Sequence, residues 1–291
     1  MEYPKDYRKL LKFSEDDCFE YLASVRWPDG FTCSNCSSKE FWKSKQRQWI
    51  CSKCKTRNRV LAGTLFQDTK LPMTLWFQII WWFMGQKNGV SALALQQNFG
   101  IGSYRTAGKV LSKLRSCIAQ SGRSLLDGII EVDEAFLGGK NNKEIIAVAA
   151  EKRGLATGRI RLLHIQSRSS ADIQGFIKTV IKPGSTIVSD RHKSYPTIVK
   201  KGYQHEPQKK PYSWEEVDGN DERLLPRLHR SVSLLKRWYY GTYHGRINKE
   251  NLQTYLDEFV FRFNRRTSKS RGLVFHRMIE AAINSDPNPA Q

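Results

Sequence analysis

The stretch between residues 128 and 139 most constrains how this chain can fold. It reads Gly-Ile-Ile-Glu-Val-Asp-Glu-Ala-Phe-Leu-Gly-Gly, rich in β-branched and aromatic residues and closed by two glycines. The pattern predicts a buried strand, because the run is too short for a helix. Asp133 and Glu134 stand in its middle, and a buried carboxylate is costly unless it is paired or binds a metal. The stretch therefore holds either a salt-bridged acid at a strand end or a metal-binding acid.

The charge of the chain points to a polyanionic partner. Its 291 residues carry 48 Lys and Arg against 28 Asp and Glu, a formal net charge of +20. Solubility alone needs far less charge than this. The length predicts one large domain with one or two small ones. No apolar run is long enough to span a membrane, and the first residues lack the layout of a signal peptide.

Four of the six cysteines form two close pairs. Cys33 and Cys36 are followed, after a gap of fourteen residues, by Cys51 and Cys54. Two C-x2-C pairs at this spacing predict a tetrahedral zinc site, and the aromatic residues between them suit a small β-hairpin. So small a unit has little core, so the metal is expected to supply its folding free energy. Paired cysteines of this kind indicate a reducing compartment rather than a disulfide framework.

Helical patterns flank this ribbon. Ser14 can cap a helix over residues 14–27, with Asp17 at the third position after the cap. An apolar run with three tryptophans predicts a buried helix from about Leu75, capped by Thr74. At this length it is not expected to cross a membrane.

Residues 90–115 have the pattern of a helix-turn-helix. Leu95 and Phe99 are expected to face the core, Gly100 to make the turn and Ser103 to cap the second helix. That helix carries a polar and basic face, which suits a DNA groove or a phosphate backbone. The face consists of Tyr104, Arg105, Lys109, Lys113 and Arg115.

After residue 122 the pattern changes to strands. Runs at 128–139, 144–150 and 159–165 predict a three-stranded meander. Residues 170–181 have helical spacing, and residues 185–190 form a short apolar run that ends in Asp190. A strand that follows a crossover helix is expected to lie parallel to its neighbour. This order describes a ribonuclease H-like α/β fold, a mixed sheet flanked by helices.

The C-terminal part is predicted to be mostly helical. Residues 206–227 are polar and without a clear period, which predicts a loop or insertion. A helix is expected over residues 229–240, broken at Gly241, and an amphipathic helix over residues 249–264 with a basic tip at Arg265 and Arg266. Residues 285–291 are expected to be disordered.

In such a fold, the strands that carry Asp133 and Asp190 are neighbours. Asp133 and Asp190 can therefore converge on shared divalent ions, and Mg²⁺ is expected because it prefers hard oxygen ligands. No acid is obvious as a third ligand. His229 and Lys236 are seven residues apart and project from one helix face. The imidazole could bind an ion, preferably Mn²⁺, and Lys236 a phosphate; the alternative is a histidine that only packs or faces solvent.

Several motifs resemble those of bacterial insertion-sequence transposases that join a zinc ribbon and a helix-turn-helix to a DDE-type catalytic domain, the ISXO-like group. The likeness covers nearly the whole chain. It lies in Arg26-Trp27-Pro28-Asp29-Gly30, Gly63-Thr64-Leu65-Phe66, Thr69-Lys70-Leu71-Pro72, Val132-Asp133-Glu134, Gly138-Gly139, Ser189-Asp190, Leu235-Lys236-Arg237-Trp238, Gly241-Thr242, Tyr255-Leu256-Asp257-Glu258-Phe259 and Phe261-Arg262-Phe263-Asn264-Arg265-Arg266.

The resemblance implies a catalytic triad of Asp133, Asp190 and His229, because the third residue in such families can be Glu, Asn or His, with a Lys seven residues on. Lys236 fits that position. A histidine departs from a strict acid triad, so Glu258 and Glu134 are the reserve candidates. The triad would hold Mg²⁺ or Mn²⁺, while the four cysteines hold structural Zn²⁺.

The resemblance further implies an enzyme, a cytoplasmic and nucleoid-associated transposase. It would bind double-stranded DNA as a homo-oligomer, at the terminal inverted repeats and at the target, through Tyr104, Arg105, Lys109, Lys113, Arg265 and Arg266. The expected domains are 1–60 (helix and zinc ribbon), 61–122 (helix-turn-helix region), 123–270 (catalytic domain) and 271–291 (tail). Two alternatives are a regulator with an inactive core and a host nuclease of the same fold.

Overall fold

The computed structural model describes residues 2–120, 124–139, 143–190, 195, 199, 201–208 and 225–285. The chain divides into two compact units. Unit 1 is Met1–Ser121 with Thr267–Gln291, and unit 2 is Gly122–Arg266. Among the described residues there is no helix long and apolar enough to cross a membrane.

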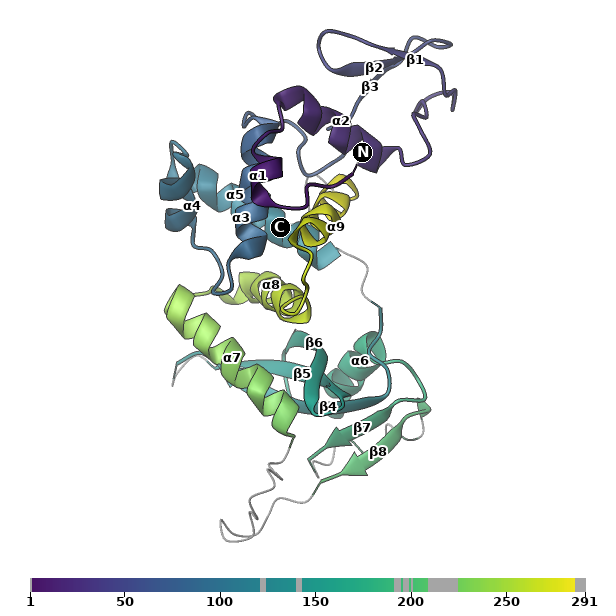
Figure 1. Ribbon diagram of the computed structural model, residues 1–291. Coiled ribbons are helices and arrows are strands. Elements are labelled where there is room, and N and C mark those ends of the chain that lie inside the picture. The colour runs from purple at the N-terminus through teal and green to yellow at the C-terminus, as the bar shows by residue number, and fades with distance from the viewer. Residues whose placement is uncertain are drawn as a thin grey trace. The chain divides into compact units, whose positions relative to one another are not determined.

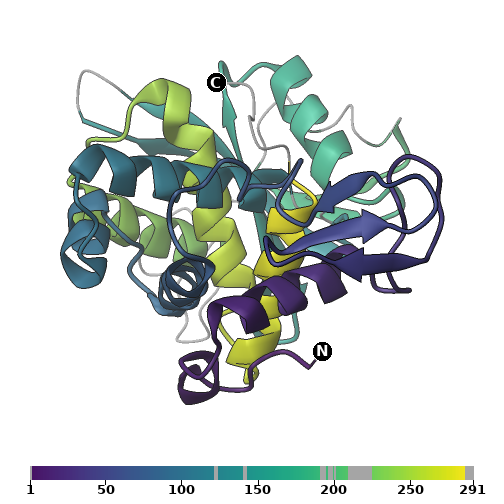
Figure 2. The same cartoon turned by 90° about the horizontal axis from the view of Figure 1, so that it is seen from above.

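Unit 1 begins with a helical segment and a small antiparallel sheet, whose strands Figure 2 draws side by side in dark blue. The predicted N-terminal cap is confirmed: the Ser14 hydroxyl accepts from the N–H of Asp17, and the Asp17 carboxylate accepts from the N–H of Ser14, which completes a capping box. The elements are α1 (Tyr7–Leu10), α2 (Glu15–Arg26), β1 (Phe41–Lys43), β2 (Gln48–Cys51) and β3 (Arg57–Arg59).

The rest of unit 1 is a helical core with aromatic packing between α2, α3 and α9. Tyr21, Phe77 and Phe275 are each almost fully buried and meet edge to face or tilted, with ring centroids 5.4–6.1 Å apart. The helices are α3 (Met73–Gly85), α4 (Ala92–Phe99), α5 (Tyr104–Gln120) and α9 (Arg271–Ile283).

Helix α3 begins earlier than predicted. Its N-cap is Pro72 rather than Thr74. Pro72 has no side chain that can accept a hydrogen bond, so the Glu15 carboxylate at the start of α2 takes that role. It accepts from the N–H groups of Met73 at 2.8 Å and Thr74 at 3.1 Å. A tertiary contact thus replaces the local cap.

The predicted helix-turn-helix is present as α4 and α5. Gly100 ends α4 in the left-handed region with φ 61°, and the hydroxyl of Ser103 accepts from the N–H of Thr106 at the start of α5. Leu95 is fully buried, and Phe99 is half-buried against Trp82.

The segment 271–291, expected to be a tail, begins with a helix of 13 residues, α9. Ser270 caps it, and an apolar face including Val274, Phe275 and Met278 packs into the core of unit 1. The backbone of Pro4 passes so close to Gly272 that an added Cβ would lie 2.1 Å from its carbonyl oxygen. Residues 286–291, part of the predicted disordered end, lie outside the described residues. The four-part domain division stays a prediction.

Unit 2 is a five-stranded mixed sheet in the order β6-β5-β4-β7-β8. Strands β4, β5 and β6 form the predicted antiparallel meander, and β7 pairs parallel with β4 after the crossover helix α6. This order and these directions are those of the ribonuclease H-like fold, as predicted. The elements are β4 (Ile129–Leu137), β5 (Glu144–Arg153), β6 (Ala156–Ile165), α6 (Ser170–Val180), β7 (Thr186–Ser189), β8 (Gln204–Pro207), α7 (Pro226–Tyr243), a 3-10 turn (Lys249–Asn251) and α8 (Leu252–Asn264).

Helices cover both faces of this sheet (Figure 1). On one face, α6 packs against alternate residues of β4, among them Ile130 and Val132. On the other face, α7 and α8 pack against Ala135 and Leu137 of the same strand. Because side chains alternate along a strand, Glu131 and Asp133 share the α7 face, whereas Glu134 points to the α6 face.

Several boundaries in unit 2 differ from the predictions, among them those of β8 and α7. Strand β8 overlaps the start of the predicted loop. It was not predicted because its polar residues have no apolar alternation; it pairs in parallel with β7. Helix α7 continues through Gly241 to Tyr243. A glycine costs a helix about 1 kcal/mol, and packing of Tyr243 on Trp238 and Tyr255, at 4.8 and 4.9 Å between ring centroids, outweighs that.

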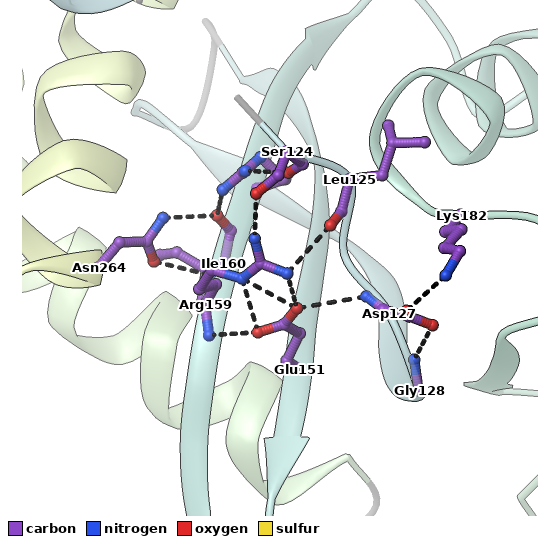
Figure 3. A network of polar contacts seen from close by, with 10 residues as sticks. Ser124, Leu125, Asp127, Gly128, Glu151, Arg159, Ile160, Lys182 and Asn264 are labelled. Carbon is purple, nitrogen blue, oxygen red and sulfur yellow. Dashed lines mark hydrogen bonds and ion pairs between the residues drawn. The ribbon is translucent and has the colours of Figure 1, made fainter. Parts of the chain in front are cut away.

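An ion pair between buried Glu151 and half-buried Arg159 links β5 to β6 (Figure 3). The Glu151 carboxylate accepts from the Arg159 guanidinium, which also donates to the hydroxyl of Ser124 and the carbonyl of Leu125. Gly158 lies directly over this pair, since a Cβ there would sit 2.8 Å from that of Glu151. Burial tends to raise the pKa of Glu151, but the hydrogen bonds from Arg159 outweigh it and hold that pKa below its usual value.

This pair predicts a pH-dependent loss of stability. A carboxyl with a lowered pKa in the folded protein stabilises it above the unfolded pKa, 4.5, and that contribution is lost as pH falls through the folded pKa. Glu151→Gln should lower the free energy of unfolding by about 2 kcal/mol at neutral pH. The difference from the unaltered protein should shrink below pH 4.5. Urea unfolding at both pH values tests this, and a difference independent of pH would contradict it.

Candidate active site and zinc centre

The four paired cysteines meet at one end of the small sheet in unit 1. Their Sγ atoms all lie within 4.8 Å of one another, with 3.5 Å between Cys33 and Cys54 and between Cys36 and Cys51. Sulfurs around a tetrahedral Zn²⁺ at 2.3 Å lie about 3.8 Å apart. The donor set and its spacing therefore fit zinc.

Neighbouring groups act unequally on the four thiols. Hydrogen bonds with the hydroxyl and N–H of Thr56 lower the pKa of the Cys54 thiol to about 5, which favours the thiolate that zinc requires. A hydrogen bond with the backbone of Ser38 lowers the pKa of Cys36, but the neighbouring thiols and burial raise it to about 12. The side-chain amide of Asn58 and the N–H of Asn35 lie within weak hydrogen-bonding distance of the Cys33 sulfur, at 3.8 and 3.5 Å. Such outer partners hold metal ligands in place.

The predicted DNA-binding face of α5 is only partly exposed. Tyr104, Arg105 and Lys109 are exposed on the N-terminal half of the helix. Lys113 is half-buried, and its ammonium donates to the carbonyl of Leu65 at 3.0 Å. Arg115 is buried and donates to the carbonyl of Val90, so it does not belong to an exposed basic face as predicted. A basic residue on a helix can thus serve to pack one segment onto another.

In unit 2 the register of the sheet places the two predicted catalytic aspartates side by side. The last parallel pair between β4 and β7 is Glu131 with Val188. Two residues further along each strand, Asp133 lies opposite Asp190, and both share the α7 face of the sheet. Neighbouring strands are about 4.8 Å apart, so the two carboxyl groups are close neighbours.

The environment of Asp133 reflects this neighbourhood. Burial raises the pKa of its carboxyl, a hydrogen bond from the N–H of Glu134 at 2.8 Å opposes the rise, and the charges of Glu134 and Asp190 add to it. His229 acts electrostatically on the same carboxyl in the opposite sense. The structure therefore brings Asp190 and His229 within electrostatic reach of Asp133.

The other two acids of β4 are each bound by an arginine. Glu131 accepts from the guanidinium of Arg227 at 3.0 Å and from the N–H of Leu228 at 2.8 Å, at the start of α7. Glu134 accepts from Arg168 at 2.8 Å on the opposite face of the sheet, and from the hydroxyl of Tyr195 at 2.8 Å. Among the described residues, Asp133 has no ion-pair partner.

Helix α7 presents His229 and Lys236 to solvent on one side. Tyr240, three turns beyond His229 on that side, donates its hydroxyl hydrogen to the carbonyl of Gly138, just after β4 ends. The Glu131 contact holds the start of α7 to β4 in the same way. The side of α7 that carries His229 and Lys236 therefore runs along β4, past Asp133.

The two reserve candidates for a third ligand are already engaged. Glu258 is fully buried in α8 and accepts from the guanidinium of Arg262 at 2.8 Å. Glu134 is held by Arg168 and Tyr195 as described. Both carboxylates thus have structural partners, whereas His229 is exposed beside the aspartates.

Arg265 and Arg266 follow the end of α8. The Arg265 guanidinium stacks on Phe261 at 3.6 Å from the ring centroid, and that of Arg266 stacks on Phe263 at 3.9 Å. Arg266 also donates to the carbonyls of Thr157 and Gly158.

Two family models match this chain. Residues 13–57 match the model of a transposase zinc-ribbon domain, and residues 125–264, nearly all of unit 2, match that of an ISXO2-like transposase domain. The chain belongs to the ISXO2-like insertion-sequence transposases. The zinc ribbon is thus assigned by its family and by its four clustered cysteines.

Three solved structures resemble this transposase distantly. A chain of a simian T-cell lymphotropic virus intasome in complex with PP2A regulatory subunit B56 gamma has 17% identity, covers 64% of this chain and 71% of that one, and has a TM-score of 0.35. The HTLV-2 integrase catalytic core domain with magnesium, in its dimeric form, has 13% identity, 52% and 97% coverage and a TM-score of 0.34. Its trimeric form has 14% identity, 48% and 84% coverage and a TM-score of 0.26. No curated protein matches the chain. The fold is therefore assigned from the strand order of unit 2.

Sequence reasoning missed the side chains that position this site. They are Arg168, Tyr195, Arg227 and Tyr240, which bind the two flanking glutamates and the backbone of Gly138. The only signal in the sequence was that three acids on one buried strand need partners.

The zinc site of the transposase predicts a specific folding defect. Cys36→Ser removes one of four thiolates, so the ribbon should lose zinc and unfold. Trp49, 3% exposed and packed against Trp27, should then become solvent-exposed. Metal analysis and tryptophan fluorescence measure this. Cys117→Ala, which alters a buried cysteine outside the cluster, should keep its zinc; a zinc-loaded, native-like Cys36→Ser protein would contradict the assignment.

Proposed function

We propose that this transposase binds the terminal inverted repeats of its element and catalyses metal-dependent DNA strand cleavage and strand transfer. The proposal rests on a difference among the acids of β4 in their cationic partners. Glu131 and Glu134 each have an arginine partner. Asp133 has none among the described residues, and it lies in register with Asp190. A carboxylate left without a cationic side chain, beside a second carboxylate, suits a divalent cation.

Asp133, Asp190 and His229 are the proposed ligands. Two carboxylates supply the hard oxygen donors that Mg²⁺ prefers, and an imidazole nitrogen adds a donor that suits Mn²⁺. When bound, such ions polarise the attacking oxygen and stabilise the leaving oxygen in phosphoryl transfer. Lys236, two turns after His229 and exposed on the same side of α7, would bind a phosphate of the DNA.

The proposed reaction on DNA has two steps. Water attacks a phosphodiester at the end of the element, and the freed 3′-hydroxyl attacks the target DNA in line. The zinc ribbon and the helix-turn-helix would recognise the inverted repeats, with Tyr104, Arg105 and Lys109 on the exposed part of α5. An element has two ends, so we propose that the transposase acts as a homo-oligomer on DNA.

The first test removes a carboxylate. Asp133→Asn should lower cleavage of an element-end duplex by at least about 1000-fold, because a ligand to the reacting ions is lost. DNA binding should persist, since recognition is assigned to unit 1. Asp127→Asn, the same change at an exposed aspartate paired with Lys182, is the matched control and should cleave normally. Persistent cleavage by Asp133→Asn would favour a different site, and binding without cleavage by the unaltered protein would favour the inactive regulator.

The second test concerns His229. His229→Ala should abolish cleavage without changing the melting temperature, because the side chain is exposed. His229→Glu replaces nitrogen by oxygen and should shift the preferred ion from Mn²⁺ towards Mg²⁺. Nicking assays with each ion measure both effects. Full activity of His229→Ala would exclude the residue as a ligand.

A further inference from the structure

The tip of the β5–β6 hairpin carries an unusual combination of exposed side chains. Arg153 pairs with Ala156 across a turn of two residues, Gly154 and Leu155. Gly154 adopts φ 57°, as a tight turn of this kind requires. Leu155 is entirely exposed to solvent, and Lys152 and Arg153 beside it are exposed as well.

Two arginines from elsewhere in unit 2 bind the backbone of this hairpin. Arg227 donates to the carbonyl of Gly154 at 2.9 Å. Arg266 donates to the carbonyls of Thr157 and Gly158. Carbonyl groups accept these hydrogen bonds without cancelling the charge of Arg266. The hairpin is thus held against α7 and the end of α8 by cationic side chains.

Within the part of the chain that the structure describes, positive charge accumulates here without a paired acid. Lys152, Arg153, Arg230 and Arg266 make no ion pair with any described residue. Burial lowers the pKa of Arg266, and the charges of Arg230 and Arg153 lower it further, so both of these side chains lie close enough to repel the Arg266 guanidinium. The nearby acids Glu151 and Glu131 are already paired with Arg159 and Arg227. A cluster of uncompensated cations of this kind suits a polyanion.

The cluster lies near the proposed catalytic residues. Arg227 joins the hairpin tip to Glu131, and Arg230 follows His229 directly in α7. Glu131 and Asp133 are two residues apart on one face of β4, about 7 Å at the usual rise of a strand. Phosphates of one DNA strand recur about every 3.4 Å along the helix axis. The cations are thus placed to meet phosphates within a few nucleotides of one held at Asp133.

We propose that Arg153, Arg230 and Arg266, with the tip of the β5–β6 hairpin, form a phosphate-binding surface for the double-stranded DNA that flanks the scissile phosphate. The position of the scissile phosphate rests on the function proposed above. This surface belongs to the catalytic unit and is separate from the residues of unit 1 to which recognition of the repeats is assigned.

Salt dependence of binding tests this surface in the full-length protein. Each phosphate contact adds about 0.9 to the slope of log K against log salt. Arg153→Gln and Arg230→Gln should each make the slope less steep by about that amount, as measured by fluorescence anisotropy with a labelled duplex. Lys178→Gln, the same loss of charge on the opposite face of the sheet in α6, should leave the slope unchanged. Unchanged melting temperatures are expected, because these side chains are exposed.

A second measurement locates the DNA. Leu155→Cys carrying a photoactivatable cross-linker should react with nucleotides within a few positions of the cleavage point on an element-end duplex. The proposal would be overturned if Arg153→Gln and Arg230→Gln left the slope unaltered, or if Lys178→Gln changed it equally. It would also be overturned if position 155 gave no cross-link. Cleavage by Asp133→Asn would instead refute the catalytic assignment while these binding results still stood.

Discussion

Three carboxylates lie within four residues of one central strand, and the rest of unit 2 must supply partners for them. Glu131 and Asp133 point to one face of β4 and Glu134 to the other, so both faces must supply compensating groups. Arg168 and Tyr195 compensate Glu134 on the α6 face. On the α7 face, Arg227 and the N–H of Leu228 compensate Glu131. That contact fixes the start of the helix that carries His229, so the structural acid positions the proposed catalytic residue.

Strand β6 makes hydrogen bonds near both ends of unit 2, where the chain enters and leaves it. Near the entry, Arg159 and Arg161 donate to Leu125 and Ser124. At the exit, the side-chain amide of Asn264 both donates to and accepts from the backbone of Ile160 (Figure 3). The family match begins and ends at these anchors, at residues 125 and 264. Both ends of the matched segment are thus hydrogen-bonded to β6.

Local sequence patterns predicted the fold and the aspartate pair. They did not predict the partners that lie far away in the sequence. Apolar runs and a crossover helix give strand order, and register follows from alternation, so Asp133 and Asp190 could be paired from sequence. The arginines that bind Glu134 and Glu131 lie 34 and 96 residues away, and no local pattern marks them. Helix α9 was missed because its stabilisation comes from packing against α2, α3 and α5, and β8 because an edge strand of polar residues lacks an apolar period.

The close approach of the two aspartates has an electrostatic cost that can be estimated. Two ionised carboxylates about 5 Å apart repel by about 3 kcal/mol at an effective dielectric constant near 20. The positive end of a helix such as α7 offsets about 0.3–1 kcal/mol of this. The helix therefore offsets only part of this repulsion, and burial, together with the charges of Glu134 and Asp190, raises the pKa of Asp133. A divalent cation bound between the two carboxyl groups would relieve the repulsion. In the proposed site, His229 would add a nitrogen ligand without adding negative charge.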